Sequence, residues 1–330
     1  MSIKATIIVP VYNGRDRVLK CIESIFSQSY HNIELLIFDD GSKDDSYDVL
    51  QAYIKDNRPD WCEVSLVKQE NMGVAKTRNK GIKCAAGEYV FFVDQDDFLD
   101  INYCADYITE AEKTHSDIVV GGYERISDNG DVLRVVDLKD YAWSKFLVVA
   151  PWAHLYRRDF LKDNSIAFLP SKIGEDVYFN LVAYSYTDKI AVLVGNTNYK
   201  WVNNMESVSN SRQVEATKDG SPIYLLKEIH KSLLNNTTTD NRLREYFFIR
   251  YIVWYMLFTL RGTKKDIYFN VIKELFDWLK SEYPEYKNNR YIFRKPKGEI
   301  NSVSMSVKIV MILHRLHMDR ICLGFLTKRK

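Results

Sequence analysis

The first 125 residues alternate short apolar runs with stretches of helical spacing, and this alternation restricts the fold more than any other feature of the chain. After the first run, for example, Val18, Ile22 and Ile25 recur at helical intervals. Strand, helix and strand repeated in this order indicate a mostly parallel sheet with helices on both faces. We therefore predict an α/β fold. Its expected strands are residues 5–11, 33–39, 63–68, 88–94 and 117–123.

The remainder of the chain predicts a second, helical region. A polar segment with both Gly and Pro, residues 211–222, marks a domain boundary. The predicted domains are residues 1–212, which contain the sheet, and residues 213–330, which are helical. Shorter strands are expected at 132–137, 190–194 and 197–202, and helices at 222–235, 239–262, 264–282 and 303–324.

Composition narrows the class of protein. The 330 residues include 46 Lys and Arg against 44 Asp and Glu, and this balance gives no reason to expect a nucleic-acid-binding protein. The five cysteines are scattered with no CxxC pair, which fits a reducing cytoplasm better than a disulfide framework. The N-terminus lacks a secretory leader pattern, and the apolar stretch at 247–260 is shorter than the ~20 residues of a membrane span. We expect a cytoplasmic protein.

An acidic cluster follows the fourth apolar run, and ligands of open α/β sheets bind beyond such strand ends. Asp94 and Asp96 are two residues apart and share a face in extended backbone, and Asp97 follows them. Hard divalent cations bind carboxylate oxygens and keep positions for water and substrate phosphates. Because like charges this close need a counter-ion, the cluster predicts a metal or metal–phosphate site.

Three further motifs follow strands at the same expected edge. After the first run, a turn exposes Tyr12, which is either a platform for a flat ligand or an ordinary half-buried tyrosine. After the second, Asp40 lies in Asp-Asp-Gly-Ser, where capping explains Ser42 and Asp44 but leaves Asp40 without a purpose. After the third, a helix start with Gly73 and several cations suits an anionic phosphate, or it is a solvated basic helix.

A second acidic pair, Glu175 and Asp176, opens a helix after a glycine. Acids are favoured in a first helical turn by the helix dipole, and a carboxylate there is also a candidate general base for a hydroxyl nucleophile. The motifs GxGxxG, GxxxxGK[ST], GxSxG and HExxH do not occur, which removes the usual support for dinucleotide, P-loop, α/β-hydrolase and zinc-protease chemistry.

The order of these motifs resembles the inverting family-2 glycosyltransferases of GT-A fold, over about residues 3–210. The resemblance rests on Pro-Val-Tyr-Asn, Asp-Asp-Gly-Ser, the NxGxxxxRNxG helix start, the DxD-type acids and the Glu-Asp helix start. It implies a Rossmann-like, mostly parallel sheet flanked by helices and followed by a C-terminal helical region. It also implies transfer of a hexose or N-acetylhexosamine from a UDP-sugar to a hydroxyl of a glycan, lipid-linked or on a glycoprotein, with Mn²⁺ or Mg²⁺. The QxxRW of processive synthases is absent, so one sugar per encounter is expected.

The resemblance also implies roles for single residues. Asp176 is the implied catalytic base, Asp96 the main metal ligand, and Asp94 lies on the ribose or metal side. Asp40 is expected to bind the uracil. The other implied contacts of the nucleotide-sugar are Pro10, Val11, Tyr12, Asn71, Gly73, Arg78 and Gln95, and those of the acceptor are Trp152, His154 and Glu175.

Some positions depart from the family's pattern. Arg15 stands where relatives often carry Glu, and His154 stands where they carry Lys. Asn203 and Asn204 lie where relatives carry Arg or His, so a cationic contact is missing or has moved.

Residues 303–330 combine six Lys or Arg with one acid, Asp319, and have an apolar helical face that includes Ile309, Leu313, Leu316 and Leu323. Such a helix suits the inner surface of an anionic membrane, and it equally suits packing on its own domain. Two other interpretations of the chain stay open: a non-catalytic nucleotide- or carbohydrate-binding module, and a DxD phosphohydrolase. The sequence does not specify the sugar, the acceptor or the linkage. It also leaves open whether the chain forms a homo-oligomer.

Overall fold

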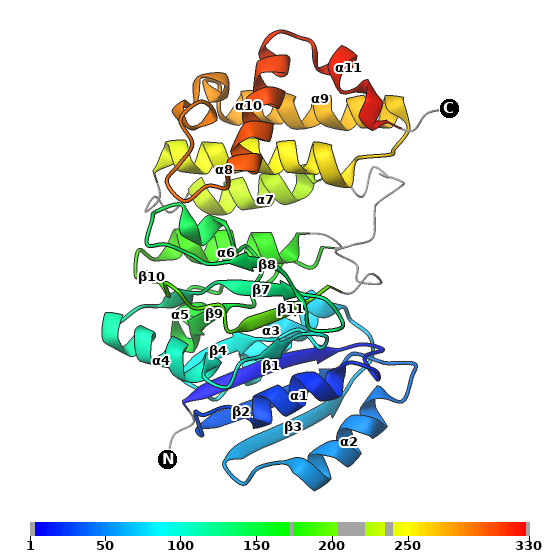
Figure 1. Ribbon diagram of the computed structural model, residues 1–330, viewed down its shortest axis with the longest axis vertical. Coiled ribbons are helices and arrows are strands. Elements are labelled where there is room, and N and C mark those ends of the chain that lie inside the picture. Colours follow the sequence, from blue (N-terminus) through cyan, green and yellow to red (C-terminus); the bar gives the residue numbers. More distant parts are fainter. Residues whose placement is uncertain (1–3, 172–173, 204–221, 235–239, 328–330) are drawn as a thin grey trace. The chain divides into compact units, whose positions relative to one another are not determined.

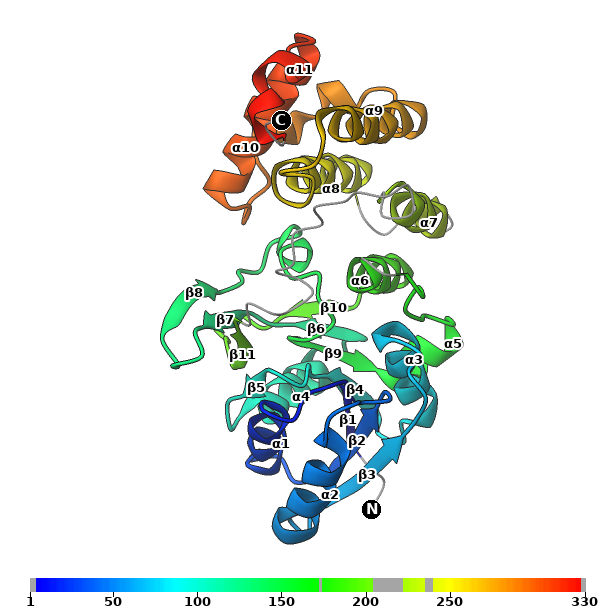
Figure 2. The ribbon, with the colours of Figure 1, turned by 90° about the vertical axis from the view of Figure 1, so that its right-hand side faces the viewer.

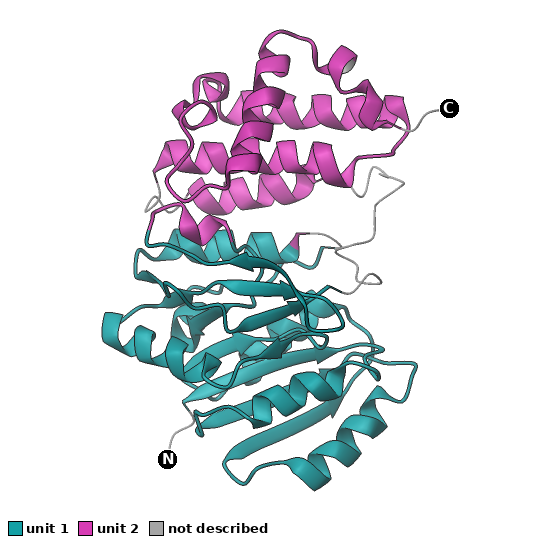
Figure 3. Ribbon diagram, in the orientation of Figure 1, with its two compact units in different colours: residues 1–140, 148–171, 175–204 teal, residues 141–147, 172–174, 205–330 magenta. Residues whose placement is uncertain are grey.

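The computed structural model describes residues 4–171, 174–203, 222–234 and 240–327. Its described residues form two compact units (Figure 3). Unit 1 contains residues 4–140, 148–171 and 175–203, and unit 2 contains residues 141–147, Gly174 and the described residues from Pro222 onward. The predicted domain boundary at 212/213 lies outside the described residues.

A seven-stranded sheet forms the centre of unit 1 in the described part of the chain (Figure 1). Its strands are β1 (Ala5–Val11), β2 (Ile33–Asp39), β3 (Cys62–Lys68), β4 (Tyr89–Phe92), β6 (Ile118–Val120), β9 (His154–Arg157) and β10 (Ile190–Val192). The spatial order is β10-β6-β9-β4-β1-β2-β3. β9 runs antiparallel to β4 and β6, and the other neighbours are parallel. The prediction of an α/β fold with a mostly parallel sheet is confirmed.

Helices cover both faces of this sheet, with α1 and α4 on one and α3 and α5 on the other (Figure 2). Their apolar residues bury the strands, and Ile7, Ile8 and Val9 of β1 have no exposed surface. Burial on both faces explains why the central strands β1 and β4 are continuous apolar runs, whereas the edge strand β3 alternates exposed with half-buried residues. The helices are α1 (Val18–Phe26), α2 (Ser46–Asn57), α3 (Val74–Cys84), α4 (Tyr103–Thr114), α5 (Arg158–Asp163) and α6 (Glu175–Tyr186).

A four-stranded sheet of unit 1 has the order β5-β11-β7-β8 in the described residues, with β5 (Phe98–Leu99), β7 (Tyr123–Ile126), β8 (Val132–Val136) and β11 (Tyr199–Val202). The single strand predicted at 117–123 is wrong, because the chain leaves β6 at Gly121-Gly122 and enters the second sheet as β7. A Cβ atom at Gly121 would lie 1.8 Å from the Tyr107 hydroxyl oxygen, and one at Gly122 would lie 2.1 Å from the Val136 carbonyl oxygen. Only glycine fits at this crossing.

Unit 2 is helical: α7 (Ile223–Leu234), α8 (Asn241–Trp254), α9 (Lys265–Glu282), α10 (Asn301–Arg315) and α11 (Asp319–Cys322). A π-helical stretch, η3 (Tyr255–Thr259), continues α8, and the short 3-10 turns are η1 (Ser144–Phe146) with Trp143 before it, η4 (Tyr286–Asn288), η5 (Arg290–Ile292) and η6 (Gly324–Leu326). Trp143 packs its ring against Tyr246 of α8 at 5.1 Å, so the short segment 141–147 belongs to this core. Among the described helices, none is both long and apolar enough to cross a membrane.

Candidate active site

The candidate motifs meet at one edge of the seven-stranded sheet because their strands end in register. Val11 of β1 pairs with Asp39 of β2, and Asp39 pairs with Lys68 of β3. The loops that begin at Tyr12, Asp40 and Gln69 therefore leave the sheet side by side. β4 is parallel to β1, and Val93, the residue after it, donates its N–H to the Ile8 carbonyl at 3.1 Å, which brings the acidic cluster to the same edge.

Gln95 holds the loop that follows β1. The Tyr12 N–H donates to Gln95 Oε1 at 2.9 Å, and Gln95 Nε2 donates to the Tyr12 carbonyl at 3.0 Å. Gly14 lies against the same amide, since a Cβ atom there would be 2.2 Å from Gln95 Oε1. Gln95 was expected to bind the nucleotide-sugar, and its amide instead fixes the backbone of Tyr12, whose ring is 41% exposed.

The Asp-Asp-Gly-Ser loop is joined to the same turn. The Asn13 N–H donates to the Ser42 hydroxyl at 3.0 Å, and the Gly14 N–H donates to the Ser46 hydroxyl at 2.8 Å. Asp44 accepts from the N–H of Ser46, the first residue of α2, at 3.1 Å. Asp44 thus comes close to the capping role expected for it, whereas Ser42 supports the neighbouring loop.

Asp40 organises the loop after β3. Its carboxylate is 4% exposed and accepts from the N–H groups of Met72 and Gly73 at 2.9 and 2.8 Å, and from Gln69 Nε2 at 2.9 Å. A carboxylate offers about four acceptor positions, so one position is left on Oδ2. Asp39, which the sequence did not single out, accepts from the N–H of Ser42 through Oδ1, while its buried Oδ2 has no partner among the described residues.

The third acid of the cluster supports the structure of the loop. Asp97 is buried and accepts from the Tyr199 hydroxyl at 2.6 Å and from the Val202 N–H at 2.9 Å. Burial, together with the charges of Asp94 and Asp96, raises the pKa of Asp97 well above its usual range. Asp97 therefore anchors β11 to the loop, and Asp94 and Asp96 are the acids of the cluster that were predicted to bind the metal.

Arg78 joins three of the predicted motifs. Its Nη2 donates to Asp94 Oδ1 at 2.6 Å and its Nη1 donates to Asp176 Oδ1 at 2.7 Å. The guanidinium is 3% exposed and lies 5.3 Å from the centre of the Phe168 ring. The sequence placed Arg78 against the diphosphate. In the structure both of its terminal nitrogens bind carboxylates, so it is a buried bridge between the acids.

Burial and nearby charges shift the pKa values of both Arg78 and Asp176. Desolvation disfavours the buried guanidinium, but the charges of Asp176 and Asp94 outweigh it and raise the pKa of Arg78, which stays protonated. Burial raises the pKa of Asp176 to about 7, against the lowering effect of Arg78 and with further increases from Glu175 and Asp94. Asp176 is still 29% exposed. A partly accessible carboxylate with a pKa near neutrality has the properties of a general base.

The position and exposure of Asp96 suit a ligand of a divalent cation whose other ligands include substrate phosphates. It is part-exposed at the strand edge, two residues from Asp94, whose Oδ1 is held by Arg78. In the described chain, no group of three or more His, Cys, Asp or Glu side chains is arranged to hold a metal. Mg²⁺ is commonly bound through one or two carboxylates plus substrate phosphates, and the donors here fit that mode.

Two of the expected acceptor contacts are buried. Trp152 is 8% exposed and stacks on Tyr199 with ring centres 4.7 Å apart, so it supports β11 and does not offer an open platform. His154 has no exposed surface, and its ring nitrogens bond the Trp152 carbonyl at 2.9 Å and the Tyr184 hydroxyl at 2.6 Å. Burial lowers the pKa of His154 to about 4. His154 is a neutral core residue, which corrects its expected role.

The other predicted residues lie around the same edge. The backbone of Gly73 has φ 86° and open space where a Cβ atom would be, so a ligand can approach it closely. Val11 has no exposed surface and its carbonyl accepts from the Asp40 N–H at 2.7 Å, so its expected contact with the nucleotide-sugar is not open, whereas Asn71 is exposed. The guanidinium of Arg125 donates to Asn203, which places a cation where the family pattern seemed to lack one. Asn204 lies outside the described residues.

Comparisons with known proteins agree with this geometry. The family model for glycosyl transferase family 2 matches residues 6–168. The glycosyltransferase GlyA of Streptococcus pneumoniae is 30% identical over 58% of this chain and 29% of GlyA. GlyG of the same organism is 31% identical over 56% of this chain and 61% of GlyG, so the chain spans less than two thirds of either relative.

A solved structure extends the likeness to most of the fold. Residues 1–349 of Staphylococcus aureus TarS in complex with UDP-GlcNAc match with a TM-score of 0.73 at 21% identity, over 95% of this chain and 92% of that one. At this identity the match shows the GT-A fold. Residues 6–168 of this chain are therefore a glycosyltransferase family 2 domain.

Proposed function

We propose that the chain is an inverting, metal-dependent glycosyltransferase. It would move one hexose or N-acetylhexosamine per encounter from a UDP-sugar to a hydroxyl of a glycan acceptor, lipid-linked or on a glycoprotein. The observation that carries the proposal is the Arg78 bridge, which joins the candidate base Asp176 to Asp94 at the strand edge. The solved TarS neighbour, described as a complex with UDP-GlcNAc, supports a UDP-sugar as the donor.

The nucleotide would bind over the loops after β1, β2 and β3. Tyr12 offers its exposed ring to the base, and the half-buried Pro10 is the nearest residue of β1 that still has exposed surface. The position left on Asp40 Oδ2 suits a uracil N–H donor. Asn71 and the open backbone of Gly73 would face the ribose and diphosphate.

The transfer step follows from the position of Asp176. Its carboxylate takes the proton of the acceptor hydroxyl while that oxygen attacks the anomeric carbon on the face opposite the diphosphate. The bond between the anomeric carbon and the diphosphate oxygen breaks, and its electron pair leaves with UDP. A single displacement inverts the configuration, so an α-linked donor gives a β-linked product. Glu175, next to Asp176, would contact the acceptor.

Asp96 would be the main ligand of a Mn²⁺ or Mg²⁺ ion, with Asp94 on the same side. When bound, such an ion neutralises the negative charge that develops on the leaving diphosphate. Asp94 has a second duty that the sequence did not indicate, because its Oδ1 is one of the two acceptors that hold Arg78.

Metal-linked UDP binding is the direct test of the proposed function. We expect UDP and UDP-sugars to raise the unfolding temperature, and Mn²⁺ to increase that shift, because a ligand bound only by the native state stabilises it. Asp96→Asn should lose the increase caused by Mn²⁺. The matched control is Asp56→Asn, since Asp56 lies near the C-terminal end of α2, away from the strand edge that carries the site. Thermal-shift measurements of the three proteins give the answer.

Turnover separates the enzyme from the binding module. Slow, metal-dependent release of UDP from a UDP-sugar supports the transferase. Stabilisation by UDP with no release from any UDP-sugar would support a non-catalytic module. No effect of uridine nucleotides with Mn²⁺ or Mg²⁺ would contradict both the transferase and a nucleotide-binding module.

Gln95→Ala should weaken donor binding more than catalysis. The substitution removes both hydrogen bonds that fix the Tyr12 backbone, so the ring must be ordered when the nucleotide binds. Each lost bond is worth about 1 kcal/mol, so the loss of both should raise KM for the donor about thirtyfold while kcat changes little. Gln69→Ala, which removes an amide bonded to Asp40 instead, is the comparison for the neighbouring loop. An unchanged KM would show that Tyr12 does not need this support.

A further inference from the structure

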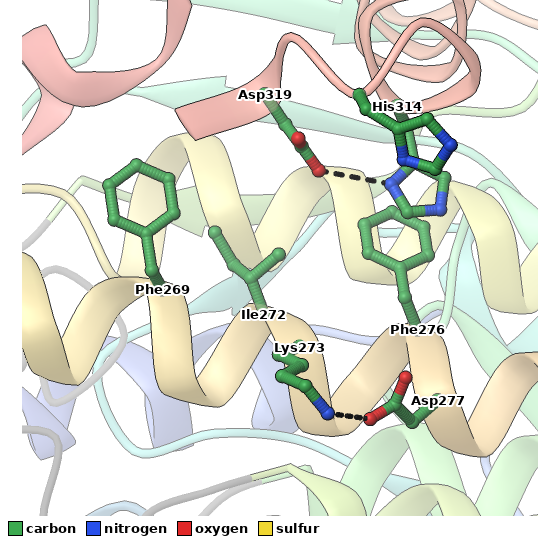
Figure 4. Close-up of a pocket in the computed structure, with 8 residues that line it drawn as sticks. Phe269, Ile272, Lys273, Phe276, Asp277, His314 and Asp319 are labelled. Carbon is green, nitrogen blue, oxygen red and sulfur yellow. Dashed lines mark hydrogen bonds and ion pairs between the residues drawn. The ribbon is translucent and has the colours of Figure 1, made fainter. Parts of the chain in front are cut away.

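The outer side of α10 is apolar although its inner side is already packed. The inner residues Val307, Val310 and Met311 are at most 3% exposed. His314, at the end of the helix, stacks on Phe276 of α9 at 3.8 Å and bonds Asp319 at 3.1 Å, beside a cleft of about 260 Å³ (Figure 4). These contacts fix α10 on its own unit, as one of the two interpretations of the sequence predicted.

The opposite side carries a second apolar stripe. Met305, Ile309 and Leu316 are 56%, 50% and 61% exposed, and their spacing of four and seven residues places them on one helical face. Further along the chain, Ile321 of α11 and Phe325 of η6 are 78% and 73% exposed. We call these five residues the outer stripe. Leu323, which the sequence assigned to the same apolar face as Ile309 and Leu316, is 5% exposed and belongs to the core of the unit.

The N-terminal and C-terminal parts of the chain carry net charges of opposite sign. Residues 1–204 contain 23 Lys and Arg against 31 Asp and Glu, and residues 205–330 contain 23 against 13. The net charges are −8 and +10, a difference that the overall value of +2 conceals. A cation also stands next to the outer stripe, since Lys308 precedes Ile309 in α10. Positive charge beside exposed apolar side chains suits one kind of partner, an anionic lipid surface.

We propose that the outer stripe docks on the headgroup and upper acyl region of an anionic bilayer. The apolar side chains enter the interface, and the net positive charge of residues 205–330 is attracted by the lipid charge. The docking is inferred from the surface of unit 2 alone. Its proposed purpose, to bring a lipid-linked acceptor to the enzyme, rests on the proposed function.

Vesicle co-sedimentation of the full chain tests the docking. We expect binding to phosphatidylcholine vesicles that contain phosphatidylglycerol, little binding to pure phosphatidylcholine, and release at high salt. Ile321→Ser with Phe325→Ser should weaken binding about tenfold or more, because two large apolar side chains no longer enter the interface. The matched control is Val132→Ser with Leu133→Ser on β8 of unit 1, which removes two similarly exposed apolar side chains and should leave binding unchanged.

Several outcomes would overturn the docking. Equal vesicle binding by the stripe variant and the native chain would do so, as would equal loss in the β8 control. Binding to soluble inorganic polyphosphate but not to vesicles would assign the positive charge to an anionic polymer. A dimer in light scattering that the stripe variant dissociates would assign the stripe to a second copy of the chain. Release of UDP from a UDP-sugar in solution is a separate measurement, so failure of the docking and failure of the proposed function are told apart.

Discussion

Asp176→Asn is expected to lose about 10²–10⁴ of the transfer rate while donor binding survives, because general-base assistance is worth that much. The Asn side chain keeps a carbonyl oxygen that can accept from Arg78 Nη1, as Asp176 Oδ1 does at 2.7 Å. The bridge to Asp94 therefore remains and the variant should fold normally. Single-turnover transfer rates, with UDP-sugar affinity measured separately, check both halves of the prediction.

The pH dependence gives this prediction a second readout. Burial raises the pKa of Asp176 to about 7, so the carboxylate is protonated, and inactive as a base, at lower pH. The rate should rise with pH, about tenfold per unit below pH 7, and level off above it. Asp176→Asn should abolish this rise. Glu175→Gln is the discriminating partner: if it removes the rate and the rise while Asp176→Asn keeps both, the base is Glu175.

The sequence predicted the strands that end at the site. It did not predict that the segment 117–123 leaves the first sheet and enters the second. β1 and β2 are buried apolar runs, β3 is a half-exposed edge strand, and each leads directly into one of the loop motifs, a signal that is local. The break at Gly121-Gly122 depends on the Tyr107 hydroxyl and the Val136 carbonyl, which are distant in sequence. Steric limits of this kind come from tertiary contacts, so periodicity alone cannot show them.

The site residues show the same difference between local and long-range information. The positions of Tyr12, Asp40, Asp94 and Asp176 can be predicted from the order of the motifs and the edge of the sheet. The residues that their side chains contact cannot be predicted in this way. Trp152 and His154 look available for an acceptor because an indole and an imidazole suit sugars, yet both are packed behind β11 and α6. The clamp of Gln95 on Tyr12 joins residues that are 83 positions apart, and the spacing of the motifs carries no trace of it.

The second large effect is expected at Arg78, the positioning residue of the site. Arg78→Met leaves Asp94 and Asp176 without the cation that holds them, and removing one partner of a buried ion pair costs about 3–5 kcal/mol. The two carboxylates are about 30% exposed, so we expect a loss of unfolding free energy at the lower end of that range. Transfer should fall by on the order of 10²-fold, because small displacements of a catalytic group cost that much. Urea unfolding and the transfer rate measure the two effects.

A pH profile distinguishes this role from general structural support. Arg78 lowers the pKa of Asp176, so its removal should raise that pKa and move the rise in rate to higher pH. Arg78→Lys keeps a positive charge without the fork that reaches both acids, so it should lose rate with a smaller displacement of the profile. The matched control is Arg157→Met, since Arg157 also bridges two acids, Glu88 and Asp117, each at 3.3 Å. That variant should lose stability and keep the native pH profile. If Arg78→Met lost stability alone and kept the native profile, Arg78 would only support the fold, and the joining of Asp94 to Asp176 would have no part in catalysis.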